Sequence, residues 1–253
     1  MSLMNEFFDI VRSQVDKVQS TQGDAIQRAA ALTAESIANG GIFYIYDRGH
    51  LLSQELLHRA GGPAFVRKMT FDLPNMRIGF GSNPPKCRAD ATDLKQYTED
   101  FEDKCIEAIM VQNCMKAGDV LFYNSVSGSG RVTISVARTA KRLGIKLIVL
   151  TNKATNDRIG EHDESLKLYK YADVYMDNCV IDGDAAVTYE GCDERILPMS
   201  GISAAFVGWA YIAATIEELS ARGIKPTVYR SVSSVGGPEQ LQEAYKRYDE
   251  LGY

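Results

Sequence analysis

The sequence lacks the features that mark several large classes of protein. Its 253 residues contain no run of about 18 apolar residues, so we expect no membrane-spanning helix. Asn5, Glu6 and Asp9 stand where a secretion signal would be basic and then apolar. There is no internal repeat and no low-complexity tract. We therefore expect a cytoplasmic protein that does not contact a membrane.

Basic residues are in short supply. The 28 lysines and arginines are outnumbered by 33 acidic residues, which gives a net charge of -5. Nucleic acids attract basic surfaces, so this balance argues against a nucleic-acid partner. An anionic small ligand is still possible, because it needs only local amides and hydroxyls.

Cysteine and histidine are scarce and scattered. The five cysteines form no CxxC pair, and the three histidines form no zinc pattern with them. We expect reduced cysteines, no metal and no cofactor. The residues are Cys87, Cys105, Cys114, Cys179, Cys192, His50, His58 and His162.

Apolar runs that alternate with helical segments are abundant. Strands are predicted at 42–46, 120–123, 146–150 and 173–176, with another inside 64–71, and helices at 51–60, 94–115 and 132–143. Fully apolar strands separated by helices are typical of a parallel sheet covered on both faces. The expected fold is α/β, a three-layer αβα sandwich with a parallel sheet of about five strands.

Helical patterns also flank this core. Two helices separated at Gly23 and Asp24 are expected in the first forty residues, and further helices at 200–222 and 238–251. We divide one domain into a helical arm (1–39), an αβα core (40–230) and a C-terminal helix (231–253). The apolar stripes of the arm predict packing on the sheet or on a partner, and thus a homodimer or larger homo-oligomer.

The loop after the strand at 120–123 has the composition of an anion site. It reads Asn124-Ser125-Val126-Ser127-Gly128-Ser129-Gly130 and leads into a helix. Glycine allows close approach of the backbone, helix N-terminal amides face anions, and serine hydroxyls add donors. Arg131 is the only basic residue beside it, so recognition would use neutral donors. A flexible turn between strand and helix has the same composition.

Two nucleotide-binding fingerprints fail on this loop. A P-loop needs a lysine after its second glycine, and none is present. A dinucleotide fingerprint needs a third glycine, but Arg131, Val132 and Thr133 follow Gly130. A nucleotide-binding function is therefore the least favoured reading.

Ser125-x-Ser127-Gly128 after an apolar strand resembles the phosphate loop of the sugar isomerase (SIS) domain family. Segments 55–62, 183–187 and 228–231 are similar to a phosphosugar-binding subgroup of that family, and the resemblance spans residues 7–237. It implies a flavodoxin-like αβα fold, a phosphorylated sugar as ligand, and dimers. The family includes aldose–ketose isomerases, an N-acetylmuramate phosphate etherase and sugar-sensing regulators.

The resemblance assigns the sugar phosphate to particular residues. Ser125, Ser127 and Gly128 match the phosphate-loop positions. Ser129 and Gly130 occupy the next two positions, although the family often has a hydroxyl where Gly130 stands. Thr151 matches a threonine that commonly ends the next strand.

The loop at 45–50 departs from the subgroup. Where the subgroup has Gly-Thr-Gly-His-Ser-His, this chain has Ile-Tyr-Asp-Arg-Gly-His. His50 matches the last histidine and Gly49 replaces the serine, so both are assigned to the phosphosugar site and one hydroxyl is missing. Asp47 near a phosphate would be unfavourable unless Arg48 pairs with it.

Three residues are candidates for catalytic proton transfer, which both isomerisation and elimination require. They are His50, Glu55 and Glu190. Several SIS enzymes carry a glutamate further along the helix, at the position of Arg59 here, and Glu55 also fits an i+4 partner of Arg59. Glu190 could reach a site across a dimer.

The expected function is phosphosugar binding, with a sugar-phosphate isomerase or related lyase activity. The alternative is a non-catalytic phosphosugar-binding or sensing protein, which the altered first loop and the missing glutamate favour. No DNA-binding helix-turn-helix segment precedes the core, so a transcription regulator is not expected.

Overall fold

A five-stranded parallel sheet runs through the computed structural model, which describes residues 2–48, 52–71 and 99–253. The strand order is β2-β1-β3-β4-β5, so the direction of winding reverses between β1 and β3. This confirms the predicted sandwich with about five parallel strands. The strands are β1 (Phe43–Asp47), β2 (Val66–Lys68), β3 (Val120–Asn124), β4 (Lys146–Thr151) and β5 (Val174–Asp177).

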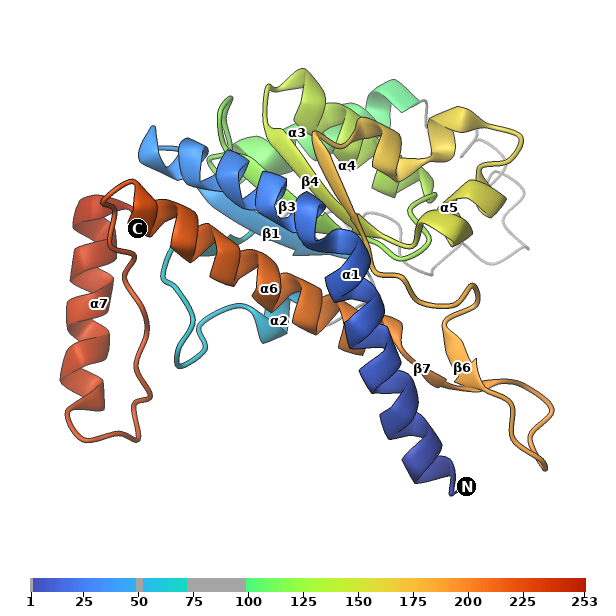
Figure 1. The fold of residues 1–253 in the computed structure, drawn as a ribbon. Coiled ribbons are helices and arrows are strands. Elements are labelled where there is room, and N and C mark those ends of the chain that lie inside the picture. Colours follow the sequence, from blue (N-terminus) through green and yellow to red (C-terminus); the bar gives the residue numbers. More distant parts are fainter. Residues whose placement is uncertain (1, 49–51, 72–98) are drawn as a thin grey trace, which may run out of the picture.

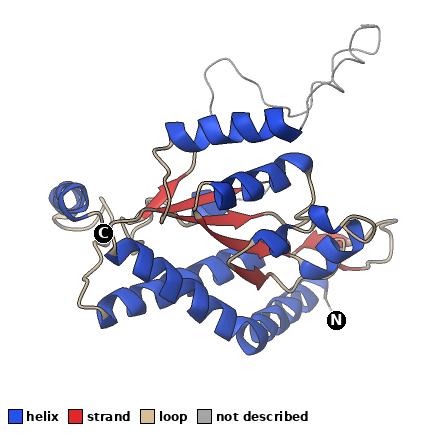
Figure 2. Ribbon diagram, turned by 90° about the horizontal axis from the view of Figure 1, so that it is seen from above, coloured by secondary structure: helices blue, strands red, loops and turns tan. Residues whose placement is uncertain are grey.

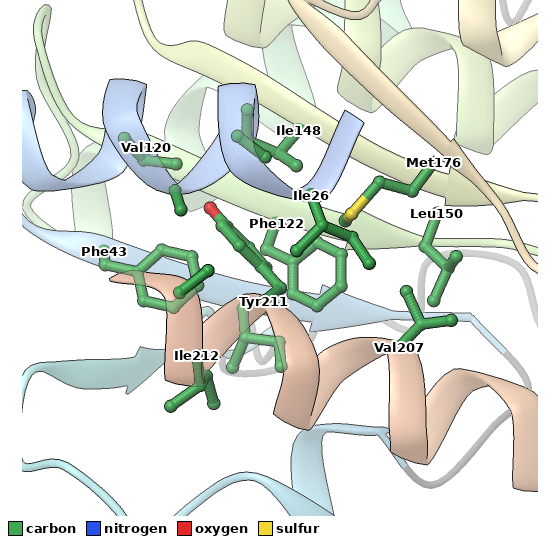
Figure 3. Packing of buried hydrophobic residues seen from close by; sticks show 14 of the residues in the cluster. Ile26, Phe43, Val120, Phe122, Ile148, Leu150, Met176, Val207, Tyr211 and Ile212 are labelled. Carbon is green, nitrogen blue, oxygen red and sulfur yellow. The ribbon is translucent and has the colours of Figure 1, made fainter. Parts of the chain in front are cut away.

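Helices cover both faces of the sheet (Figures 1 and 2). Helices α1 (Leu3–Ala38) and α6 (Ser200–Ala221) lie on one face, and α3 (Glu99–Gln112) and α4 (Arg131–Arg142) on the other. Because side chains alternate along a strand, Phe122 packs toward α6 while Tyr123 packs in the other layer. Figure 3 shows the first layer, where Tyr211 meets the rings of Phe43 and Phe122 edge-on.

The first helix corrects the predicted break at Gly23 and Asp24. Residues 3–38 form one helix, and Gly23 lies within it. Glycine costs about 1 kcal/mol inside a helix. The buried residues that follow, from Ala25 to Ile37, pack against α6 and the sheet and offset that cost. The N-terminal part of α1 extends past the sheet (Figure 1), with Met4 and Phe8 exposed.

The helix predicted at 51–60 is much shorter than expected. Helix α2 (Leu52–Glu55) is followed by His58 with a φ of 49° and Gly61 with a φ of 83°. Gly61 N donates to Tyr229 O, and Tyr229 N donates to Gly62 O, both at 2.9 Å. This pairing with a distant segment competes with local helix formation, and it stacks His58 on the ring of Tyr229.

Several elements were not predicted from the sequence. Helix α5 (Lys153–Ile159) follows β4 directly, and the 3-10 turns η2 (Glu164–Leu166) and η3 (Leu168–Tyr171) follow it. Strands β6 (Ala185–Val187) and β7 (Ile196–Pro198) form an antiparallel hairpin.

The predicted C-terminal helix is present. Helix α7 (Gly237–Leu251) begins one residue earlier than predicted and ends at the predicted residue.

Among the described residues, helix α6 is long and apolar enough to span a membrane by length and composition alone. An 18-residue window within its 22 residues has a mean hydropathy of 1.2. Half of that window is buried, however, and Figure 3 shows Val207, Tyr211 and Ile212 among the core side chains. Core helices meet the same criterion, so this is weak evidence for a membrane.

Candidate functional site

A cavity of about 290 Å³ opens at the carboxyl ends of the strands. Four segments line it: the end of β1, the loop after β3, helix α5 and the segment after β5. In open parallel sheets, ligands bind at this edge, close to the point where the strand order reverses. The lining residues are Arg48, Ser125, Val126, Ser127, Thr155, Arg158, Gly183 and Asp184.

The serine hydroxyls of the loop after β3 are available to a ligand. Ser125 and Ser127 line the cavity, and Ser129 lies half-buried beyond them. Within the described residues, none of the three hydroxyls has a hydrogen-bond partner. The backbone of Ser125 is fixed, because its N–H donates to Leu150 O at 3.0 Å.

Thr151, the last residue of β4, and Asn152, the N-cap of α5, hold the carbonyl of Val126 from behind. Val126 O accepts from Thr151 Oγ1 at 3.2 Å and from Asn152 N at 3.1 Å. Thr151 is fully buried and is not among the cavity-lining residues. The structure therefore places Thr151 as a support of the loop rather than on the cavity wall where the sequence assigned it.

The next two carbonyls are held on the same side. Asn156 Nδ2 donates to Ser127 O at 3.1 Å and to Gly128 O at 2.8 Å. Leu168 N also donates to Gly128 O, at 3.0 Å. Three successive carbonyls of the loop thus point toward the segment 151–168.

The amides of these peptides point the other way. A trans peptide is planar with its C=O and N–H on opposite sides, and the described chain has no cis bond. The N–H groups of Ser127, Gly128 and Ser129 therefore point away from the groups in the segment 151–168 that hold these carbonyls, and Ser127 lines the cavity. None of the three donates to another described residue. Successive amides in this arrangement form an anion-binding nest.

Gly128 is the residue that allows this turn. Its φ is 58°, in the left-handed region that glycine adopts without strain. A Cβ at this position would lie 2.7 Å from Thr151 Oγ1. Gly130 then begins α4 as its N-cap without a side chain, so the helix dipole adds to the field at the nest.

Arg48 lines the cavity next to the serine loop, and sequence reasoning did not assign it a binding role. The signal was present, since Arg48 stands where the resembled subgroup has a histidine. Asp47 is used differently from the expected pairing with Arg48: its carboxylate accepts from Ser53 N at 3.0 Å and from Ser53 Oγ at 2.9 Å. Asp47 thereby anchors the start of α2.

The far wall of the cavity is held by carboxylates. Asp182 accepts from Thr155 Oγ1 at 2.7 Å and from Arg158 Nε at 2.7 Å, and the Arg158 guanidinium lowers the pKa of Asp182 to about 2. Asp184 accepts from the backbone N–H groups of Met199 and Ser200 at the start of α6. The wall is thus tied to both α5 and α6.

The predicted catalytic residues do not meet in the described part of the cavity. Glu55 Oε1 accepts from Trp209 Nε1 at 3.3 Å, and Oε2 pairs with Arg59 at 3.2 Å, as the i+4 interpretation predicted. Glu190 is exposed in the turn between β6 and β7. Neither carboxylate lines the described cavity. Gly49 and His50 lie outside the described residues.

The chain resembles known proteins at the level of both sequence and fold. Residues 6–152 match the family model of the SIS domain. This chain belongs to the SIS domain family. The resemblance in the sequence is thereby confirmed, and the serine loop lies inside the matched SIS region.

Full-length relatives agree with this SIS assignment. The UPF0309 protein of Streptomyces griseus is 30% identical over 240 residues, covering 94% of this chain and 91% of its own length. A UPF0309 protein of Listeria monocytogenes is 31% identical over 237 residues, covering 92% of each chain. Among solved structures, a phosphoheptose isomerase from Francisella tularensis shares the fold, with a TM-score of 0.51 and 13% identity over 85% of this chain and 96% of its own.

Proposed function

We propose that this SIS-domain protein binds the phosphate group of a phosphorylated sugar at residues 125–130. One observation carries the proposal: three successive carbonyls of the loop are held from behind, which turns the N–H groups of the three following residues together to the other side of the loop. A phosphate offers oxygens that accept from these amides and from the hydroxyls of Ser125 and Ser127. Ser129 and Gly130 complete the site at the start of α4.

The rest of the cavity is suited to the sugar. Its volume of about 290 Å³ is close to the lower limit of small-molecule pockets, which fits a monosaccharide phosphate. Arg48 adds a positive charge beside the serine loop, where it stabilises a dianionic phosphate. Thr155 and the Gly183–Asp184 segment form the wall opposite the loop.

Replacement of Ser127 by alanine tests the site. Ser127→Ala should weaken phosphosugar binding by about 1–2 kcal/mol, the scale of a hydrogen bond to a charged group. Isothermal titration calorimetry with a panel of hexose, hexosamine and heptose phosphates measures this effect. Unchanged affinity for every member of the panel would show that the loop does not bind the phosphate.

A sugar-phosphate isomerase or lyase activity is the second candidate. SIS membership and the fold shared with a phosphoheptose isomerase favour it. Its base would be Glu55, His50 or Glu190, and Glu55 would first have to leave Arg59 and Trp209. NMR detection of new products from the same panel tests turnover. No product from any sugar phosphate, combined with binding, would assign a binding or sensing role.

Oligomeric state and location stay predictions. Met4, Phe8 and Val15 are exposed on α1, and a homodimer would cover apolar surface of this kind. Light scattering at micromolar concentration should give the mass of a dimer or larger assembly, and a monomer would contradict it. The net charge, the N-terminal residues and the cysteine spacing support a cytoplasmic location without nucleic-acid, membrane or cofactor partners.

A further inference from the structure

We propose that Asn156 is a positioning residue that sets the anion-binding form of the loop at 125–130. The inference rests on the proposed function, because it assigns a cause to the loop geometry that binds phosphate. Asn156 lies in α5, about thirty residues after the loop, and is fully buried.

One side-chain nitrogen orients two neighbouring peptides. Asn156 Nδ2 lies 3.1 Å from Ser127 O, 2.8 Å from Gly128 O and 3.1 Å from Leu166 O. An amide nitrogen carries two hydrogens, so one of them is shared between two carbonyls. Because each peptide is planar, fixing these carbonyls also fixes the N–H groups of Gly128 and Ser129 on the opposite side.

The fit between loop and side chain is close. A Cβ on Gly128 would lie 3.0 Å from Asn156 Cγ and 3.1 Å from Nδ2. The loop and the asparagine are therefore packed against each other without space for adjustment. A displacement of the Asn156 amide would be transmitted directly to the peptides on either side of Gly128.

The position uses the donors of asparagine rather than its acceptor. Asn156 Oδ1 is buried and has no hydrogen-bond partner among the described residues. An unpartnered buried acceptor is destabilising, so the side chain is not placed there for stability alone. An aspartate has the same shape but would place a second carboxylate oxygen against three carbonyl oxygens.

Asn156→Asp tests the inference through its pH dependence, with inorganic phosphate as the probe. At pH 7.5 the variant should bind phosphate about tenfold or more weakly than the wild type, because the donors are lost. Burial among carbonyl oxygens raises the pKa of a carboxyl group. At pH 5 the protonated acid donates one hydrogen, and the ratio of variant to wild-type affinity should move back toward one. The ratio cancels the titration of phosphate itself.

Asn113→Asp is the matched control. Asn113 Nδ2 also donates to two carbonyls, Thr70 O and Ile109 O, each at 2.8 Å, and does not line the cavity. Asn113 is half-buried and its Oδ1 also accepts from Thr70 N. This variant should therefore lose less stability than Asn156→Asp and keep wild-type phosphate affinity at both pH values. Equal affinities for wild type and Asn156→Asp at both pH values would overturn the inference and leave the proposed function standing.

A second measurement needs no variant, so it holds even if Asn156→Asp does not fold. In the wild type, inorganic phosphate should shift the amide proton resonances of Ser127, Gly128 and Ser129. Binding without shifts at these three amides would overturn both the inference and the proposed phosphate site. If neither inorganic phosphate nor any sugar phosphate binds the wild type, it is the proposed function that fails.

Discussion

Two neighbouring loops form this site in different ways. The loop after β3 is neutral, and its backbone is held from behind by Thr151 and Asn156. The loop after β1 is charged: Asp47 holds the start of α2 and Arg48 lines the cavity. In the loop after β3, the backbone geometry provides the proposed anion site. In the loop after β1, the charge of Arg48 adds to the attraction for the anion. The contribution of the loop after β3 to phosphate affinity should therefore depend on its backbone conformation. The contribution of Arg48 should decrease as the salt concentration rises.

The largest effect is expected for Gly128→Ala. The left-handed φ costs about 1–2 kcal/mol for any other residue, and the Cβ also meets Thr151 Oγ1. We expect a loss of about 2–3 kcal/mol in urea unfolding and no measurable phosphate binding by calorimetry. Gly40→Ala is the control, because Gly40 has a φ of 78° and open space around it. Equal stability loss for both variants, with phosphate binding retained, would contradict the shape account.

A smaller effect is expected for Arg48→Ala. Loss of a charge beside the phosphate should weaken binding about tenfold and reduce the dependence of affinity on salt. Arg131→Ala is the matched control, since Arg131 follows the serine loop but pairs with Glu102 at 3.1 Å. Titration of inorganic phosphate at two salt concentrations measures both. A salt dependence that is unchanged in Arg48→Ala would remove Arg48 from the site.

Asn124→Leu should increase stability. Asn124 ends β3 between the two loops, is fully buried, and both of its side-chain amide atoms are without partners in the described chain. An apolar replacement of similar size removes this desolvation cost, so we expect a gain of about 1 kcal/mol and a Tm rise of roughly 2–4 °C. Asn152→Leu should instead destabilise, because Asn152 bonds Thr155 N and Val180 O. A lower Tm for Asn124→Leu would show that its amide is partnered in solution.

The smallest effect is expected for Glu55→Gln. The exposed pair with Arg59 contributes about 0.3–0.5 kcal/mol, and the amide can still accept from Trp209. Phosphate affinity should stay within about twofold of the wild type. A large loss of phosphate affinity would place Glu55 in the site after all.

The sequence was informative where the physics is local. Apolar runs predicted four strands of the parallel sheet within one or two residues and a broader range for β2, because burial on both faces leaves little choice of residue. The composition of the loop after β3 pointed to Ser125 and Ser127, and both line the cavity. The helix break predicted at Gly23 was wrong, because the packing of α1 on α6 outweighs the low helix propensity of glycine.

The remaining features depend on distant contacts. Nothing in the local sequence shows that Asn156 holds Ser127 and Gly128, because that contact exists only once α5 has folded against the loop. The early end of α2 likewise follows from the pairing of Gly62 with Tyr229. Arg48 was visible only as a departure from the resembled family.

A crystal soaked with a mixture of sugar phosphates tests the central claim most directly. We expect a phosphate whose oxygens accept from the hydroxyls of Ser125 and Ser127 and from the amides of Ser127, Gly128 and Ser129, with Arg48 beside it and the sugar extending toward Thr155 and the Gly183–Asp184 segment. A sugar phosphate bound elsewhere, with these amides and hydroxyls left in water, would contradict it.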